Sequence, residues 1–241
     1  MKRLLVISSA IIFTLSSCHG WFGHHIRGNG NVTTENRSVD GFDGIDVSGA
    51  LDVYVTQDSS EAIKIETDAN LHEYIITRVE NGVLEIYPAD HANLDPSRNI
   101  KIYVSGRNFK SFQVSGASDI YSNSKIQSNE EITVDASGAS KIEMDLKAPK
   151  ISGQLSGASN LKLSGATKDL TISASGASHA KCFELMSENA DVDLSGASSA
   201  DVFASVSVKG EASGASNVKY KGNATSVAVN TSGAGSVSKE N

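Results

Sequence analysis

Residues 156–178 read SGASNLKLSGATKDLTISASGAS, a segment that begins and ends with the same four residues. The tripeptide Ser-Gly-Ala recurs through the second half of the chain in a nearly regular series, at intervals of 18 to 22 residues. Self-similarity at a period of this length is typical of proteins built from stacked repeats. The first two residues of the copies are Ser115/Gly116, Ser137/Gly138, Ser156/Gly157, Ser175/Gly176, Ser195/Gly196, Ser213/Gly214 and Ser232/Gly233.

Apolar and polar residues alternate on both sides of each copy, as in Leu161-Lys162-Leu163. A period of two is typical of strands that bury one face. A unit this short cannot bury an apolar face alone, so neighbouring units must stack and cover one another. The sequence therefore predicts an all-β fold, a parallel β-helix or solenoid with coils of about 19 residues.

The Ser-Gly pair has a structural explanation. Glycine adopts positive φ at little cost, so its recurrence predicts a tight bend at the same place in every coil. Identical serines on stacked coils can form a hydrogen-bonded ladder, as polar side chains do in other stacked β-structures. No histidine or acid accompanies every copy, and we predict no catalytic residue in this chain.

Residues 31–114 also show strand-like alternation, but without a regular repeat. An irregular β-region here would cap the open sheet edges at one end of the solenoid, which otherwise invite aggregation. We place the regular solenoid at residues 115–241 and expect 31–241 to form one continuous body.

Three local patterns stand out in the irregular region. Asn81-Gly82 lies between two apolar alternating segments and predicts a β-hairpin. Residues 68–74, DANLHEY, predict a short helix with Asp68 as its N-cap. Residues 91–98 are polar, contain Pro96, and predict a loop.

The N-terminus has the pattern of a secretory signal. Lys2 and Arg3 precede a mostly apolar stretch, residues 4–15, that is too short to span a bilayer of about 30 Å. Leu15-Ser16-Ser17-Cys18 resembles the lipobox of bacterial lipoproteins, in which the cysteine becomes the lipidated N-terminus. We therefore predict a signal peptide at 1–17, lipidation of Cys18, and a lipidated tether at 18–30. The alternative is an ordinary signal peptide with a chance cysteine.

Charge and cysteine content exclude several classes. The formal net charge is −7, which does not suit a nucleic-acid partner. Cys18 and Cys182 are the two cysteines, so neither a disulfide framework nor a cysteine-based metal site is expected. Cys182 alternates with apolar positions and is interpreted as a small buried hydrophobe. His19, His24 and His25 are interpreted as linker histidines, with weak metal binding as the alternative; no cofactor is expected.

Three further segments resemble the head GIN domain family of putative auto-transporter adhesins, which occurs in envelope lipoproteins. They are residues 41–46 (GFDGID), 81–86 (NGVLEI) and 217–222 (NVKYKG), together with the recurring SGAS. Asp46 stands where the motif that names the family has asparagine. The resemblance covers about residues 40–238 and implies a right-handed β-helix with a modified N-terminal part. It implies no assigned biochemical activity.

The leading functional hypothesis is a non-catalytic envelope lipoprotein, anchored in the outer membrane, that acts as an adhesin-like binding or scaffolding module. Its ligand would be a glycan or a protein. One alternative is a periplasm-facing envelope-maintenance protein, which the non-acidic HGWFG after Cys18 favours. The membrane face stays open.

The other alternative is a carbohydrate-active β-helix enzyme, which would need acids clustered on one face. The residues that follow SGAS form a mixed polar row instead. They are Asp119, Lys141, Asn160, His179, Ser199 and Asn217. Asp191, Asp193 and Asp201 are interpreted as solvated strand positions.

Overall fold

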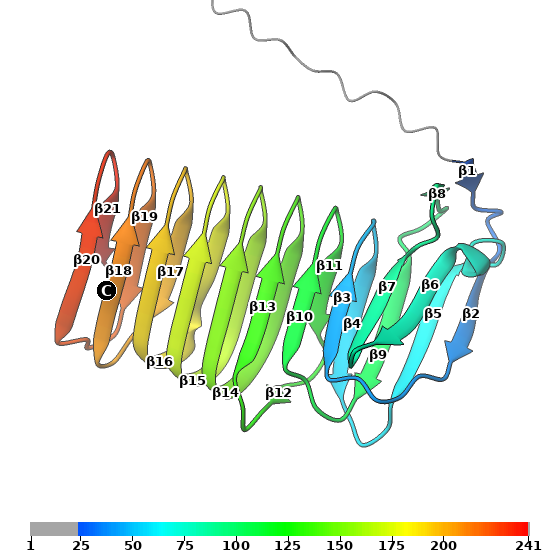
Figure 1. Cartoon of the computed structure of the whole chain (residues 1–241), viewed down its shortest axis with the longest axis horizontal. Helices are drawn as coiled ribbons and strands as arrows, with labels where there is room; N and C mark the ends of the chain where they lie inside the picture. The colour runs from blue at the N-terminus through cyan, green and yellow to red at the C-terminus, as the bar shows by residue number, and fades with distance from the viewer. Residues whose placement is uncertain (1–23, 241) are drawn as a thin grey trace, which may run out of the picture.

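The computed structural model describes residues 24–240, and Figure 1 shows an elongated stack of β-coils. Twenty-one strands and one short 3-10 helix, η1 (His72–Tyr74), make up its regular structure. The part of the chain described contains no helix that is long and apolar enough to cross a membrane. The predicted signal peptide and the Cys18 lipidation site lie outside the described residues.

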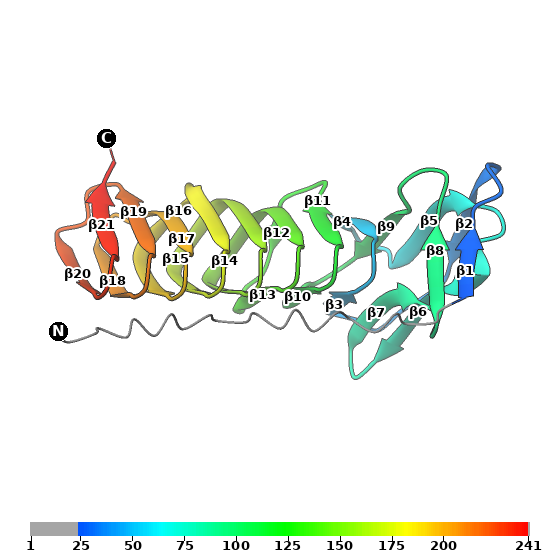
Figure 2. The same ribbon diagram turned by 90° about the horizontal axis from the view of Figure 1, so that it is seen from above.

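Each coil of the solenoid has a front strand that rises to the SGAS turn and a back strand that descends from it (Figures 1 and 2). The chain advances from right to left in Figure 1 while its front strands run upward, so the coils wind in the right-handed sense. The first regular coils comprise β10 (Ser111–Val114), β11 (Asp119–Ser122), β12 (Ile126–Gln127) and β13 (Ile132–Ala136). All pairings between the coils are parallel, which confirms the predicted all-β solenoid.

The central coils are formed by three long strands that bend around the core. These are β14 (Lys141–Leu155), β15 (Asn160–Ala174) and β16 (His179–Leu194). The last coils comprise β17 (Ser199–Phe203), β18 (Ser207–Ala212), β19 (Asn217–Lys221), β20 (Ser226–Thr231) and β21 (Ser236–Lys239).

The core is a set of apolar columns along the stack. Ile151, Leu170, Ala190 and Val208 occupy equivalent positions in successive coils, and all four are at most 2% exposed. Alternate side chains of each strand point into this core, which explains the period of two in the sequence. Burial of these side chains stabilises the stack, at roughly 25 cal/mol per Å² of apolar surface.

The N-terminal region is a twisted cap with mixed pairing. Its strands are β1 (His24–Arg27), β2 (Val32–Arg37), β5 (Ala62–Asp68), β6 (Ile75–Glu80), β7 (Val83–Pro88), β8 (Ala92–Asp95) and β9 (Lys101–Gly106). β5 pairs antiparallel with both β2 and β9. The β6–β7 hairpin confirms the Asn81-Gly82 prediction: φ is 52° at Asn81 and 80° at Gly82, as a tight hairpin turn requires.

Two strands join the cap to the solenoid. β3 (Gly44–Val47) pairs in parallel with β7 and β10, and β4 (Asp52–Gln57) pairs in parallel with β9 and β11. On the back face, the ring of Tyr54 lies 5.3 Å from those of Tyr103 and Tyr121, so one aromatic stack spans the junction. Strand pairing therefore continues from the cap into the coils without a break.

The helix predicted at residues 68–74 is wrong in its extent and its cap. Strand β5 continues to Asp68, and only His72–Tyr74 form a 3-10 turn. The Asp68 carboxylate instead accepts hydrogen bonds from the backbone N–H of Gly30 at 2.7 Å, and from the N–H and hydroxyl of Ser97, both at 2.8 Å. These three distant donors replace the local backbone N–H groups that a cap would use.

Two segments expected to be irregular contain strands. β1 lies within residues 18–30, which were predicted to be a tether, and β8 lies within the predicted loop 91–98. The two strands pair in parallel, with His24 opposite Ala92 and Arg27 opposite Asp95. Each satisfies the backbone groups of the other, and this long-range pairing has no local signal in either segment.

A candidate ligand-binding groove

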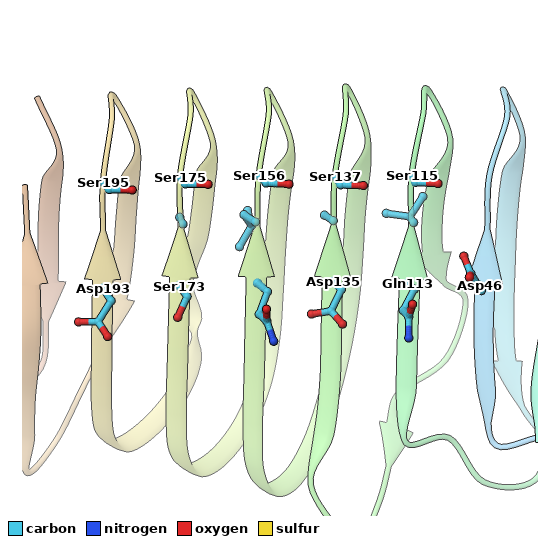
Figure 3. Close-up of a pocket in the computed structure, with 15 residues that line it drawn as sticks. Asp46, Gln113, Ser115, Asp135, Ser137, Ser156, Ser173, Ser175, Asp193 and Ser195 are labelled. Carbon is cyan, nitrogen blue, oxygen red and sulfur yellow. The ribbon is translucent and has the colours of Figure 1, made fainter. Parts of the chain in front are cut away.

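A groove of about 530 Å³ runs along the front face of the solenoid, just below the SGAS turns (Figure 3). One side is a row of acids, amides and one hydroxyl, which we call the acid–amide row. Its members are Asp46, Gln113, Asp135, Gln154, Ser173 and Asp193. The other side is a row of serine hydroxyls, which we call the serine row. It consists of Ser115, Ser137, Ser156, Ser175 and Ser195.

Strand register aligns the acid–amide row. Gln113 pairs with Asp46 on one side and with Asp135 on the other, and the same column continues through Gln154 and Ser173 to Asp193. Each step along this column equals the spacing between neighbouring strands, about 4.8 Å. The groove therefore presents one polar side chain per coil at a constant interval.

The bend between the two rows is narrow because the residue between them points inward. Ala136 separates Asp135 from Ser137, and Ala174 separates Ser173 from Ser175; these alanines are 3% and 4% exposed. Since neighbouring residues of a strand point to opposite faces, the residues on either side of each alanine point outward. The core and the groove thus share the same short segment of every coil.

The repeat glycines form a continuous column at the turns. Gly157 has a φ of +73°, and a Cβ placed on it would lie 2.6 Å from the carbonyl oxygen of Gly138. The following residue closes the gap between coils: the N–H of Ala158 donates to that same carbonyl at 2.8 Å. The column comprises Gly49, Gly116, Gly138, Gly157, Gly176, Gly196, Gly214 and Gly233. Its first member lies between the joining strands β3 and β4, in the early copy Ser48-Gly49-Ala50.

The two serines of each SGAS have different environments. The first serines line the groove as far as Ser195, and Ser213 and Ser232 continue the series in the last coils. The second serines are buried, and several donate to carbonyl oxygens of the turn, as Ser178 does to Ser175 at 2.7 Å. These buried serines are Ser118, Ser140, Ser159, Ser178, Ser198 and Ser216. Only the first serine is therefore available to a ligand.

The groove is acidic and incompletely hydrogen-bonded. Its lining contains three carboxylates and no basic side chain. Burial raises the pKa of Asp135, and burial together with the nearby charge of Glu85 raises the pKa of Asp46. Within residues 24–240, the buried Oδ1 of Asp135 has no hydrogen-bond partner. An ionised carboxylate only accepts hydrogen bonds, so the groove side of this lining favours a ligand that donates them.

The back face, by contrast, carries side chains of both charges. The row predicted after SGAS is stacked as expected, with Lys141 next to Asp119 and His179 next to Asn160. Beside this row, the carboxylate of Glu143 forms ion pairs with the Nζ atoms of Lys141 at 2.7 Å and Lys162 at 2.8 Å. These contacts lower the pKa of Glu143 to about 2. Because positive and negative side chains are mixed on this face, the acids do not form an acidic patch there.

The three acids considered together in the sequence are divided between the two faces. Asp191 and Asp193 lie on the front part of β16, whereas Asp201 lies on β17 at the back. Asp193 lines the groove and accepts a hydrogen bond from the backbone N–H of Glu211 at 3.1 Å. Asp193 is an exposed strand residue, as interpreted from the sequence, and in addition it lies in the groove.

The other members of the acid–amide row were missed by sequence reasoning. A signal for them exists: each lies two residues before the first serine of a repeat, as Asp135 does before Ser137. The position varies between aspartate, glutamine and serine, so it does not appear as a repeat when identical residues are sought.

The possible metal ligands are not brought together. No group of three or more His, Cys, Asp or Glu side chains that could hold a metal ion occurs in the described part of the chain. His25 lies in β1 with its Nε2 3.5 Å from Asp95, and His19 lies outside the described residues. Cys182 is fully buried, as expected for a small hydrophobe, and burial raises its pKa to about 12.

The fold and the groove define a right-handed parallel β-solenoid with a polar groove along its axis. Residues 41–224 match the family described as putative auto-transporter adhesin, head GIN domain, and the chain belongs to this family. This confirms the resemblance seen in the sequence. No curated protein matched the chain.

Solved structures share the whole fold. A putative adhesin from Bacteroides fragilis NCTC 9343 superimposes with a TM-score of 0.84 at 18% identity, over 89% of this chain and 100% of that one. A putative lipid binding protein from Parabacteroides distasonis ATCC 8503 gives 0.72 at 20% identity, over 90% and 100%. A putative adhesin from Parabacteroides merdae ATCC 43184 gives 0.69 at 24% identity, over 90% and 99%. At these identities the similarity shows a common fold.

Proposed function

We propose that this protein is a non-catalytic lipoprotein of the cell envelope whose solenoid is an adhesin-like binding or scaffolding module. The observation that supports binding is the front groove, where polar side chains stand in register along the solenoid axis. The family to which the chain belongs is described as putative adhesins, and this description supports a location of the protein in the cell envelope or at the cell surface.

The residue that lies between the acids supports a non-catalytic role. Asp46 and Asp135 are separated by two strand steps, about 9.6 Å along the column. The carboxyl groups of retaining glycosidases are about 5–5.5 Å apart, and those of inverting enzymes are about 6.5–9.5 Å apart, with an open space for water between them. Here Gln113 occupies the position between the two aspartates. The column therefore suits binding better than glycoside hydrolysis.

A lipid on Cys18 would hold the cap end of the solenoid near the membrane. The cap carries β1, which starts at His24, and residues 18–23 can span at most about 20 Å. The solenoid extends away from β1 along its long axis (Figure 1). In this arrangement the front groove starts at β3 and runs along the solenoid, away from the anchored end.

Metabolic labelling tests the lipoprotein proposal. Cells that express the full chain with a C-terminal tag are grown with labelled palmitate, beside cells that express Cys18→Ala. We expect the label and the membrane fractionation to be lost in the variant, while Cys182→Ala retains both. Absence of label from the wild-type chain would refute lipidation.

Protease treatment of intact cells tests the adhesin role. Loss of the C-terminal tag from intact cells is expected if the solenoid is displayed outside. If the tag is protected in intact cells and cleaved after lysis, the solenoid faces the periplasm. That result would replace adhesion with a role in envelope maintenance.

A further inference from the structure

The front groove has the geometry of a site for a long, repeating ligand. Its polar positions recur at every coil, parallel to the axis of the solenoid. A compact ligand would contact only two or three of these positions. An extended chain with regularly spaced polar groups can use all of them.

The charge of the lining selects against anionic chains. Asp46, Asp135 and Asp193 line the groove without a basic residue among them. Glu85 pairs with Asp46 on one side, and Glu211 follows beside Asp193 on the other. Like charges brought together in a partly desolvated groove repel strongly. A ligand that carries uronic acid, sulfate or phosphate groups is therefore disfavoured.

The hydrogen-bonding character favours a ligand with many donors. The carboxylates of Asp46, Asp135 and Asp193 line the groove, and a carboxylate can only accept hydrogen bonds when it is ionised. The serine row and Gln113 and Gln154 can both donate and accept. Ammonium and hydroxyl groups on the ligand would satisfy these positions together.

An extended peptide fits the groove less well than a glycan. Peptides that lie along β-structure usually pair their backbone with an exposed strand edge. The backbone of the groove is already paired between coils on both sides, as at Val134, which lies between Phe112 and Gly153. The groove therefore offers side chains and no free edge. Its lining also contains no aromatic residue, so recognition depends on hydrogen bonds and charge.

We propose that the front groove binds a linear glycan that carries free amino groups. The glycan lies along the solenoid axis, so that its consecutive sugar rings contact successive coils. The Asp135 and Asp193 carboxylates receive the ammonium groups, and the serine row contacts the ring hydroxyls. This inference rests on the proposed binding function and names the class of ligand that the groove takes.

Calorimetric titration of the full mature protein in detergent tests the inference. The probes are a chito-oligosaccharide with free amino groups, its N-acetylated form, oligogalacturonate, and oligolysine of equal charge. We expect binding of the first probe, weaker binding of the acetylated form, and none of the anionic one. Loss of a charge-assisted hydrogen bond in Asp135→Asn should weaken binding about ten- to a hundredfold.

Asp201→Asn is the matched control. It removes the same charge from a partly buried carboxylate on the back face, in β17, and should leave affinity unchanged. Equal loss in the two variants, or no binding of the amino glycan by the wild type, would overturn the inference.

The remaining outcomes separate the ligand class from the general function. Equal affinity for oligolysine would replace the glycan with a basic peptide and overturn the inference, while binding as such would stand. Cleavage of the chito-oligosaccharide would refute the non-catalytic role instead. Circular dichroism of each variant shows whether the solenoid is intact.

Discussion

Gly157→Ala places a methyl group inside the glycine column, at the turn between β14 and β15. The new Cβ would lie 2.6 Å from the carbonyl oxygen of Gly138 and 3.1 Å from its nitrogen, and both atoms belong to the backbone. Neither can move without disturbing the hydrogen bond from Ala158 to Gly138. The substitution therefore forces two coils apart locally.

Two costs add at this position. A non-glycine residue at a φ of +73° costs about 1–2 kcal/mol. Forcing an extra carbon into close-packed structure typically costs a further 1–3 kcal/mol. The sum, about 2–5 kcal/mol, corresponds to a fall in Tm of roughly 4–20 °C for a chain of this size.

Gly41→Ala separates the two costs. Gly41 has a φ of +76°, and a Cβ placed on it would meet no atom within 4 Å. The free energy of unfolding of this control variant should therefore fall only by the conformational cost, about 1–2 kcal/mol. Urea unfolding of the mature protein, monitored by circular dichroism, measures both. Equal losses in the two variants would refute the claim that close approach between turns requires glycine.

Other consequences concern acid stability, thiol reactivity and the core. Three donors lower the pKa of Asp68, so the stability that its ionised form supplies is present above its unfolded pKa, near 3.9, and is lost as pH falls through the lower folded value. Asp68→Asn should therefore have a lower Tm than wild type at neutral pH, and the gap should narrow in acid; a constant gap across a pH series of melting curves would contradict this. Cys182 should react with a thiol reagent only after unfolding, because it is buried and its pKa is raised to about 12; rapid labelling of the folded chain would show that its coil opens. Leu170→Ala should cost about 2–5 kcal/mol in urea unfolding, since Leu170 is 1% exposed in the core column; a loss below 1 kcal/mol would mean that the column is loosely packed.

The repeat and the local turns could be predicted from the sequence. The SGAS series determines the coil, because each copy needs the same bend and each strand the same inward positions. Asn81-Gly82 determines its hairpin, since both residues tolerate the positive φ that the turn requires. These features depend on interactions within a few residues, or on the same interaction repeated in every coil.

The cap could not be predicted in the same way, because distant contacts override its local signals. Asp68 has the sequence context of a helix cap, yet its donors come from Gly30 and Ser97. β1 and β8 become strands only by pairing with each other across more than sixty residues. Nothing within either segment specifies that partner.

The groove could be predicted from the sequence only in part. By itself, the sequence determined that serines and glycines would stack, and that alternate residues would face outward. Only the tertiary structure decided that the first serine of each repeat is outside and the second is buried. The same structure aligns Asp46, from the joining strand β3, with Gln113 and Asp135 in one column. The physical reason is register: strand pairing between coils sets which outward side chains become neighbours, and that pairing is a property of the whole stack.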